Sequence, residues 1–159
     1  MMKRLVFCCL LVSVLVATAT AQSTVFLVRH AERADSSTDS DLSEAGRART
    51  ERLAKMLKDA NITAIYATEF KRTQLTAAPL AKTLGITVTT IPSKDKDALA
   101  AKLRALNGNV LVVGHGNTIP DLVKALGISE PINIGENDYD NLFEVELGEK
   151  PKLIHLHYH

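Results

Sequence analysis

Apolar residues follow two different spacings along the chain after residue 22. Short apolar runs predict buried strands, and longer segments with apolar residues near a spacing of 3.6 predict helices. The predicted strands lie at 25–28, 62–68, 86–91 and 110–113, and the predicted helices at 43–60, 69–84, 94–106 and 119–126. Because strands and helices alternate, we predict right-handed crossovers and a three-layer α/β fold, with a mainly parallel sheet flanked by helices.

Residues 139–159 show a different period. Apolar and polar side chains alternate in 139–147 and again in 152–159, with the Gly-Glu-Lys-Pro segment 148–151 between them. An alternation of two around a short turn is typical of a hairpin. We therefore predict that the sheet ends in a C-terminal antiparallel hairpin.

The helical segments also predict which side chains face the core. Ser43 is placed to cap the first helix. Its inward face is predicted to contain Ala48, Leu53, Met56, Leu57 and Ala60. In the second helix the inward residues are Leu75, Ala78 and Leu80, and in the third Leu99, Leu103 and Leu106. Pro79 is expected to kink the second helix or to mark the start of its second half, and Gly85 to follow its end.

The first 21 residues predict a secretory signal peptide. Lys3 and Arg4 precede an apolar run from Leu5 to Ala17, and small residues follow as far as Ala21. The run falls short of the roughly 20 residues that a spanning helix needs, so a membrane anchor or a core helix is the weaker alternative. Cleavage after Ala21 predicts a secreted or periplasmic protein with no stable membrane insertion.

The remaining 22–159 segment has the length of a single domain. Both cysteines, Cys8 and Cys9, precede it, so we expect neither disulfides nor thiolate chemistry in the mature chain. In the full sequence the 19 basic and 18 acidic residues nearly balance, and there is no Trp. This composition argues against a nucleic-acid partner. A dinucleotide site is also set aside, since no G-x-G-x-x-G follows the first strand.

Polar residues follow three of the predicted strands. They are Arg29-His30, the segment 69–72 with Arg72, and His115-Gly116. The carboxyl ends of parallel strands meet at one edge of a sheet. Guanidinium groups match phosphate oxygens with paired donors, and backbone N–H groups at a helix start add to the positive field. The pattern predicts a site for a tetrahedral dianion, although each residue taken alone suits a surface ion pair.

Four segments are similar to motifs of a known family. They are Arg29-His30-Ala31, which is similar to an Arg-His-Gly motif; 42–47, similar to Leu-Thr-x-x-Gly-x; 67–77, similar to Ser-x-x-x-Arg-x-x-x-Thr-Ala; and Gly114-His115-Gly116, similar to a second histidine motif. In this order the chain resembles the histidine phosphatase superfamily, also called the phosphoglycerate-mutase-like family. The resemblance covers nearly all of 22–159, and its short form is similar to the compact phosphohistidine phosphatases.

The resemblance implies a role for each matching residue. His30 is implied to be the nucleophile that becomes phosphorylated, and Arg29, Arg72 and His115 are implied to hold the phosphoryl group. Cationic neighbours would keep His30 neutral, as attack on phosphorus requires, and would stabilise the transferring oxygens. The family chemistry needs no metal and no cofactor.

Further phosphate contacts are expected from three residues. Gly116 offers backbone donors. Arg33 is either another pocket arginine or a solvated loop charge. Ser36 stands where many members of the family carry Asn, so the contact there is expected to be weaker.

The general acid is not identified by the sequence. Many members of the family supply a Glu from a long insert after the third strand, and here that insert is reduced to 92–97. Four carboxylates remain as candidates, and none is preferred: Glu32, Glu69, Asp95 and Asp97.

Three histidines alternate at the end of the chain and would share one strand face: His155, His157 and His159. Such a pattern can bind a metal ion. With no carboxylate or Cys beside them in sequence, surface histidines are the favoured interpretation.

We expect a metal-independent phosphatase that forms a phosphohistidine intermediate on a small phosphoester or phosphoramidate. A phosphomutase is disfavoured, because members with that activity use long inserts. A non-catalytic module that binds phosphorylated surface sugars or lipids remains an alternative, which the intact His30 disfavours and the missing acid favours. The sequence does not indicate the oligomeric state.

Overall fold

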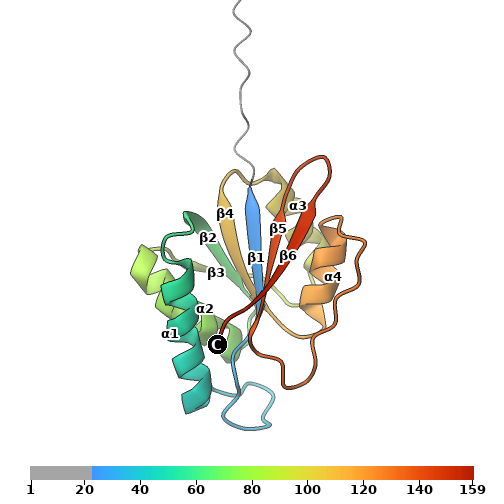
Figure 1. The fold of residues 1–159 in the computed structure, drawn as a ribbon. Coiled ribbons are helices and arrows are strands. Elements are labelled where there is room, and N and C mark those ends of the chain that lie inside the picture. The colour runs from blue at the N-terminus through green and yellow to red at the C-terminus, as the bar shows by residue number, and fades with distance from the viewer. Residues whose placement is uncertain (1–22) are drawn as a thin grey trace, which may run out of the picture.

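A six-stranded sheet lies between two layers of helices in the computed structural model of the chain, which describes residues 23–159 (Figure 1). The strands are β1 (Thr24–Arg29), β2 (Ile62–Ala67), β3 (Val88–Thr90), β4 (Asn109–Gly114), β5 (Asn141–Glu146) and β6 (Lys152–His157). The helices are α1 (Glu44–Leu57), α2 (Lys71–Leu84), α3 (Lys96–Ala105) and α4 (Thr118–Ala125). The predicted signal peptide and its cleavage site lie outside the described residues.

The strand order is β3-β2-β4-β1-β5-β6. The pairs from β3 to β1 are parallel, and β5 pairs antiparallel with both β1 and β6. The predicted three-layer α/β fold and its C-terminal antiparallel hairpin are therefore confirmed. The third strand is shorter than predicted, with three residues at the sheet edge in place of 86–91.

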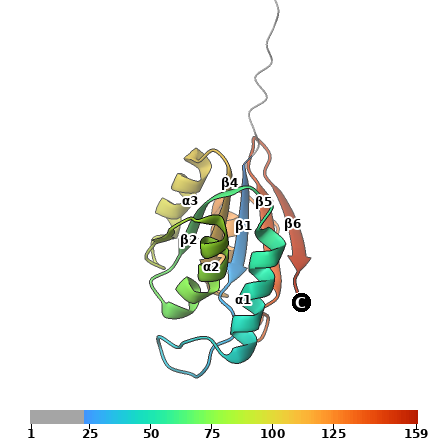
Figure 2. The same ribbon diagram turned by 90° about the vertical axis from the view of Figure 1, so that its left-hand side faces the viewer.

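β1 is buried on both faces because it lies between β4 and β5. Val25 and Leu27 belong to the core beneath α3 and α4, whereas Phe26 and Val28 belong to the core beneath α1 and α2. Figure 1 shows these two helix pairs on opposite sides of the sheet, and Figure 2 shows α1 and α2 covering one face. A strand covered on both faces has apolar side chains at successive positions, which explains the unbroken apolar run.

The predicted inward face of α1 was partly wrong. Ser43 caps the helix as predicted, accepting a hydrogen bond of 3.1 Å from the Gly46 amide. Ala48 and Met56 are exposed, and Met56 keeps 44 % of its surface. The buried residues of α1 are Gly46, Thr50, Leu53, Ala54 and Leu57. Small side chains replace predicted larger ones because α1 packs closely against α2 and the loop after β1.

The predicted face of α2 also shifts. Ala78 is exposed, and Leu75 is only half-buried. The buried residues are Thr73, Thr76, Ala77, Leu80 and Ala81. The helix runs through Pro79 without ending, and Gly85 closes it in the left-handed conformation at φ 67°. Two threonines thus occupy inward positions that apolar spacing does not reveal, and the site explains why.

The carboxyl ends of β1, β2 and β4 lie at the same edge of the sheet, where the loop between β1 and α1 also lies (Figure 1). None of the helices among residues 23–159 combines the length and the apolar character that crossing a bilayer requires.

Candidate active site

An open pocket of about 480 Å³ lies at this edge of the sheet. It is lined by Arg29, His30, Arg33, Phe70, Arg72, Ser93, His115, Gly116, Asn117 and Thr118. Six of the residues predicted from the sequence are therefore brought together. None of the described residues that line the pocket is acidic, so its charge is strongly positive.

The His30 ring is held in one tautomer. Its Nδ1 lies 2.8 Å from the carbonyl oxygen of Ala31, which only accepts, so Nδ1 carries the hydrogen and Nε2 keeps a lone pair. The His30 amide donates to the Gly114 carbonyl at 2.9 Å, which anchors the residue to the end of β4. The pKa of His30 is lowered to about 3, chiefly by burial; the bond to Ala31 opposes this shift, and the nearby His115, Arg72 and Arg29 add to it. His30 is neutral at physiological pH, as a nucleophile must be.

His115 is fixed by a chain of hydroxyl groups. Its Nε2 lies 2.9 Å from Thr68 Oγ1, which lies 2.9 Å from Thr73 Oγ1. Thr73 donates to backbone carbonyls, so Thr68 donates to Thr73 and accepts from His115 Nε2–H. The lone pair of His115 is then on Nδ1, which faces Nη2 of Arg72 at 3.4 Å. Burial and then the charge of Arg72 lower the pKa of His115 to about 4.

The guanidinium of Arg29 is positioned from one side. Its Nη1 donates to the carbonyls of Gly135 and Glu136, both at 2.7 Å, and the group lies 4.4 Å from the ring centroid of Tyr139. Its Nε–H has no acceptor among the described residues although the atom is buried. Arg29 therefore keeps an unused donor beside His30.

Arg72 has the same arrangement on the other side of the pocket. Nη1 donates to the Thr38 carbonyl at 2.8 Å, and the guanidinium lies 4.4 Å from the ring centroid of Phe70. Its buried Nε–H also lacks an acceptor among residues 23–159. Burial and then the positive charge of Arg33 lower the pKa of Arg72. An anion in the pocket would relieve the repulsion between the cations.

Thr76 joins the loop after β1 to α2. Its Oγ1 accepts from the Ala31 amide at 2.9 Å and donates to the Arg72 carbonyl at 2.6 Å. One buried hydroxyl therefore links the residue after His30 to the backbone of Arg72. No physical signal in the sequence indicates this role, because a threonine inside a helix resembles an ordinary surface position; Thr76 is marked only by its place in segment 67–77, which is similar to a family motif.

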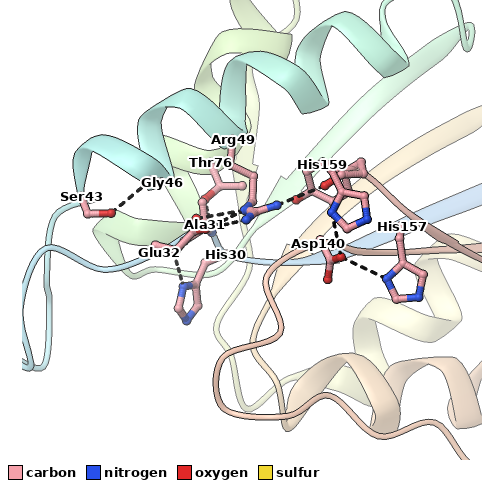
Figure 3. A network of polar contacts seen from close by, with 11 residues as sticks. His30, Ala31, Glu32, Ser43, Gly46, Arg49, Thr76, Asp140, His157 and His159 are labelled. Carbon is pink, nitrogen blue, oxygen red and sulfur yellow. Dashed lines mark hydrogen bonds and ion pairs between the residues drawn. The ribbon is translucent and has the colours of Figure 1, made fainter.

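Glu32 forms an ion pair with Arg49. Its two carboxylate oxygens accept three hydrogen bonds of 2.7 to 3.0 Å from Arg49 of α1 (Figure 3). Burial raises the pKa of Glu32, but the bonds from Arg49 outweigh this and leave it below its ordinary value. Arg49 also donates to the Tyr158 carbonyl at 3.1 Å. Glu32 does not line the pocket and is poorly suited to donate a proton there.

The other candidate acids are also placed outside the pocket lining. Glu69 accepts from the Ser93 amide at 2.8 Å and from its hydroxyl at 3.0 Å. Partial burial raises the pKa of Glu69, but hydrogen bonds, including those from Ser93, bring it below its ordinary value. Asp95 is the residue before α3, and Asp97 lies in the first turn of that helix. The structure thus brings none of the four carboxylates into the lining.

Ser36 is exposed in the loop between β1 and α1 and does not line the pocket. The lining instead includes polar residues that the sequence did not single out, namely Ser93, Asn117 and Thr118. Asn117 and Thr118 lie at the start of α4, where the predicted backbone donors near Gly116 are also found.

The three C-terminal histidines lie on β6 and just beyond it. His155 Nε2 is 2.7 Å from Asn141 Oδ1, whereas His157 and His159 both contact Asp140, at 3.2 and 3.4 Å (Figure 3). Within residues 23–159 no group of three or more His, Cys, Asp or Glu side chains is arranged to hold a metal ion.

Comparison with known families gives a match for the first half of the domain. Residues 25–93 match the Histidine phosphatase superfamily (branch 1), a segment that contains Arg29, His30 and Arg72 but ends before His115. No curated protein matches the chain significantly.

Solved structures extend the similarity to the whole described domain. The protein histidine phosphatase SixA complexed with tungstate has a TM-score of 0.70 and 23 % identity, over 84 % of this chain and 96 % of that one. A mycobacterial glucosyl-3-phosphoglycerate phosphatase has a TM-score of 0.67 and 16 % identity, over 83 % and 97 %. Phosphoserine phosphatase from Entamoeba histolytica has a TM-score of 0.65 and 16 % identity, over 86 % and 96 %.

The TM-scores of these neighbours show a shared fold, and the high coverage of each neighbour shows that this chain is similarly compact. The shared fold includes the pocket that brings together Arg29, His30, Arg72 and His115, of which the first three lie within the matched segment 25–93.

Proposed function

We propose that the protein is a metal-independent phosphatase that acts through a phosphohistidine at His30. One observation carries this proposal: the bond from His30 Nδ1 to the Ala31 carbonyl leaves the Nε2 lone pair free in a pocket whose lining is cationic. A neutral imidazole beside unpaired guanidinium donors is the arrangement that nucleophilic attack on a phosphoryl group requires.

In the first step, the Nε2 lone pair forms a bond to phosphorus while the bond between phosphorus and the leaving oxygen or nitrogen breaks. The leaving group departs with that electron pair and takes a proton from solvent, because no acidic side chain lines the pocket. In the second step, water attacks phosphorus and releases a proton to solvent, the P–N bond breaks, and His30 Nε2 regains its lone pair as phosphate leaves. Arg29, Arg72 and His115 stabilise the charge on the three peripheral oxygens throughout.

The test is to trap the intermediate. The protein is incubated with a ³²P-labelled aryl phosphate without added metal, quenched in base, and digested for peptide mapping. We expect acid-labile, base-stable label on the peptide that contains His30, and no label in His30→Asn. Turnover by His30→Asn at the wild-type rate would exclude the mechanism.

A non-catalytic phosphate-binding module is the second candidate, and the absence of an acidic residue from the described pocket lining favours it. The two functions predict different results with one reagent. A binding module would bind vanadate or phosphate tightly in a calorimeter yet release no product from aryl phosphates or phosphoramidates. Product release that exceeds the amount of protein many times over would exclude it.

We also propose that the protein is exported, on the basis of the predicted signal peptide. Mass spectrometry of the protein recovered from a secreting host should give a mature chain that begins at Gln22. A full-length chain retained in the cytoplasm would contradict this.

A further inference from the structure

Arg33 is a lining residue with a fixed backbone and an unpaired side chain. It forms an isolated antiparallel bridge with Leu42, and the flanking bonds from Ser43 N to the Glu32 carbonyl and from Ala34 N to the Asp41 carbonyl are both 2.9 Å. The loop is therefore pinned on both sides of Arg33. Its side chain is exposed at the pocket and forms no hydrogen bond or ion pair with another described residue.

The surrounding charges do not neutralise Arg33. The nearby arginines of α1 have carboxylate partners, since Arg47 pairs with Asp41 at 2.5 Å and Arg49 pairs with Glu32 at 2.7 Å. Asp35, two residues after Arg33, accepts from the Ser37 amide at 2.8 Å and forms no ion pair with Arg33. Arg33 and Arg72 both line the pocket, and the charge of Arg33 helps to lower the pKa of Arg72. The carboxylates of Asp35, Asp39 and Glu69 oppose part of this positive charge from a distance, but neither guanidinium forms an ion pair with a carboxylate of the described residues.

The pocket is larger than a phosphoryl group requires. A water molecule occupies about 30 Å³ in the liquid, so the volume of about 480 Å³ accepts a phosphoryl group together with a leaving group of several heavy atoms. Arg29, Arg72 and His115 suffice for the transferring phosphoryl. Arg33 lines the same pocket and is therefore available to contact the leaving group.

We propose that Arg33 binds a second anionic group, a carboxylate or a phosphate, carried by the leaving group, so that the favoured substrates are phosphomonoesters with an additional negative charge. The proposal rests on the proposed phosphatase function and specifies its substrate class. The observations that carry it are the unpaired guanidinium of Arg33, the lining without acidic residues and the volume beyond the phosphoryl site. Arg33 acts here as a specificity residue.

The experiment compares three phosphate esters that differ in one substituent: 3-carbamoylphenyl, 3-carboxyphenyl and 3-phosphonophenyl phosphate. For each, kcat/KM is measured with the wild type, Arg33→Met and Arg33→Gln, and with Arg47→Met as a matched control. Arg47 is an exposed arginine outside the pocket lining. The readout is the ratio of kcat/KM for an anionic ester to that for the neutral carbamoyl ester. Dividing the wild-type ratio by the variant ratio cancels any general loss of activity and any difference in leaving-group pKa.

We expect the ratio of one or both anionic esters to fall by about three- to fivefold in both Arg33 variants, as for an exposed ion pair, and to stay unchanged in Arg47→Met. The wild-type preference should also diminish in 1 M salt, where charges are screened within about 3 Å. Comparison of the carboxyl and phosphono esters identifies which anion Arg33 prefers. Ratios that are the same in the wild type and both Arg33 variants would overturn the inference. Hydrolysis of the carbamoyl ester by the wild type tests the phosphatase function separately.

Discussion

The imidazole rings of His30 and His115 meet edge to face, with 5.3 Å between their centroids and 65° between their planes. Both are almost fully buried, at 4 % and 8 % exposed. Two imidazolium ions at this separation would repel each other and the adjacent arginines, so the folded protein favours the neutral form of both rings. The pair is therefore a site where protonation is costly until an anion arrives.

This cost predicts a loss of stability in acid. The pKa values of about 3 for His30 and about 4 for His115 lie below the ordinary 6.5, so between about pH 6.5 and pH 4 the unfolded chain binds protons that the folded chain does not. The free energy of unfolding should fall as the pH falls, by up to about 1.4 kcal/mol per pH unit for each ring. Urea unfolding of the wild type, His30→Asn and His115→Asn at a series of pH values checks this. Identical slopes in all three proteins would show that neither ring is the cause.

Substitution of Arg72 or of His115 should weaken the binding of a transition-state analogue. Loss of one charge-assisted contact of about 1.5 to 3 kcal/mol lowers kcat/KM by roughly ten- to a hundredfold. We expect this loss, with weaker inhibition by vanadate, for Arg72→Lys and His115→Ala. Arg47→Lys preserves charge in the same way outside the pocket and should change neither quantity. Vanadate affinity that is unaltered in both pocket variants would place these residues outside the phosphoryl site.

Thr76→Val should damage the site without removing a pocket residue. It leaves the buried Ala31 amide without its acceptor, which costs about 1 to 3 kcal/mol. Thr76→Ser keeps the hydroxyl and serves as the matched control. We expect lower unfolding free energy and lower kcat for the valine variant, with both recovered in the serine variant. Equal stability of the two variants would mean that the bond to Ala31 contributes little.

The dependence of kcat/KM on the leaving group should show whether the pocket lacks a general acid. A positioned general acid typically contributes about 10² to 10⁴ in rate, mostly for poor leaving groups. With no acidic side chain lining the described pocket, kcat/KM should fall steeply as the leaving-group pKa rises, and aryl phosphates and phosphoramidates should far exceed alkyl phosphates.

Glu69→Gln and Glu32→Gln remove two of the candidate acids. Both substitutions should change kcat/KM for aryl phosphates only modestly. If alkyl phosphates reacted as fast as aryl phosphates, and Glu69→Gln selectively abolished that activity, Glu69 would be the acid and would have to leave Ser93 to act.

The correct predictions of helix ends and of the buried strand each depended on a single residue or on a simple apolar pattern. Ser43 capped α1, Gly85 ended α2, and the apolar run of β1 indicated a strand covered on both faces. Placing Arg29, His30, Arg72 and His115 together required only that parallel strands end at one edge.

The errors came from contacts between segments far apart in the chain. Ala48, Met56 and Ala78 are apolar yet exposed, because the space between α1, α2 and the sheet is filled by small or hydroxyl-bearing residues such as Gly46 and Thr76. A methyl group at Gly46 would lie only 2.4 Å from the Glu32 carbonyl oxygen, so the glycine is what allows α1 to approach the loop after β1 so closely. The pairing of Glu32 with Arg49 likewise depends on where α1 lies, so Glu32 could not be separated from the other candidate acids by sequence.

The central place of β1 has a consequence for how the chain acquires its shape during synthesis. β1 emerges first among the described strands, yet its partners β4 and β5 begin at Asn109 and Asn141. At about 5 to 20 residues per second, the ribosome needs several seconds to deliver them. Throughout that interval Val25 to Val28 has no sheet to enter, and the pairing it awaits is of the slow, long-range kind. The strand that precedes His30 is thus an apolar segment that remains exposed to unwanted association until almost the whole chain has been made.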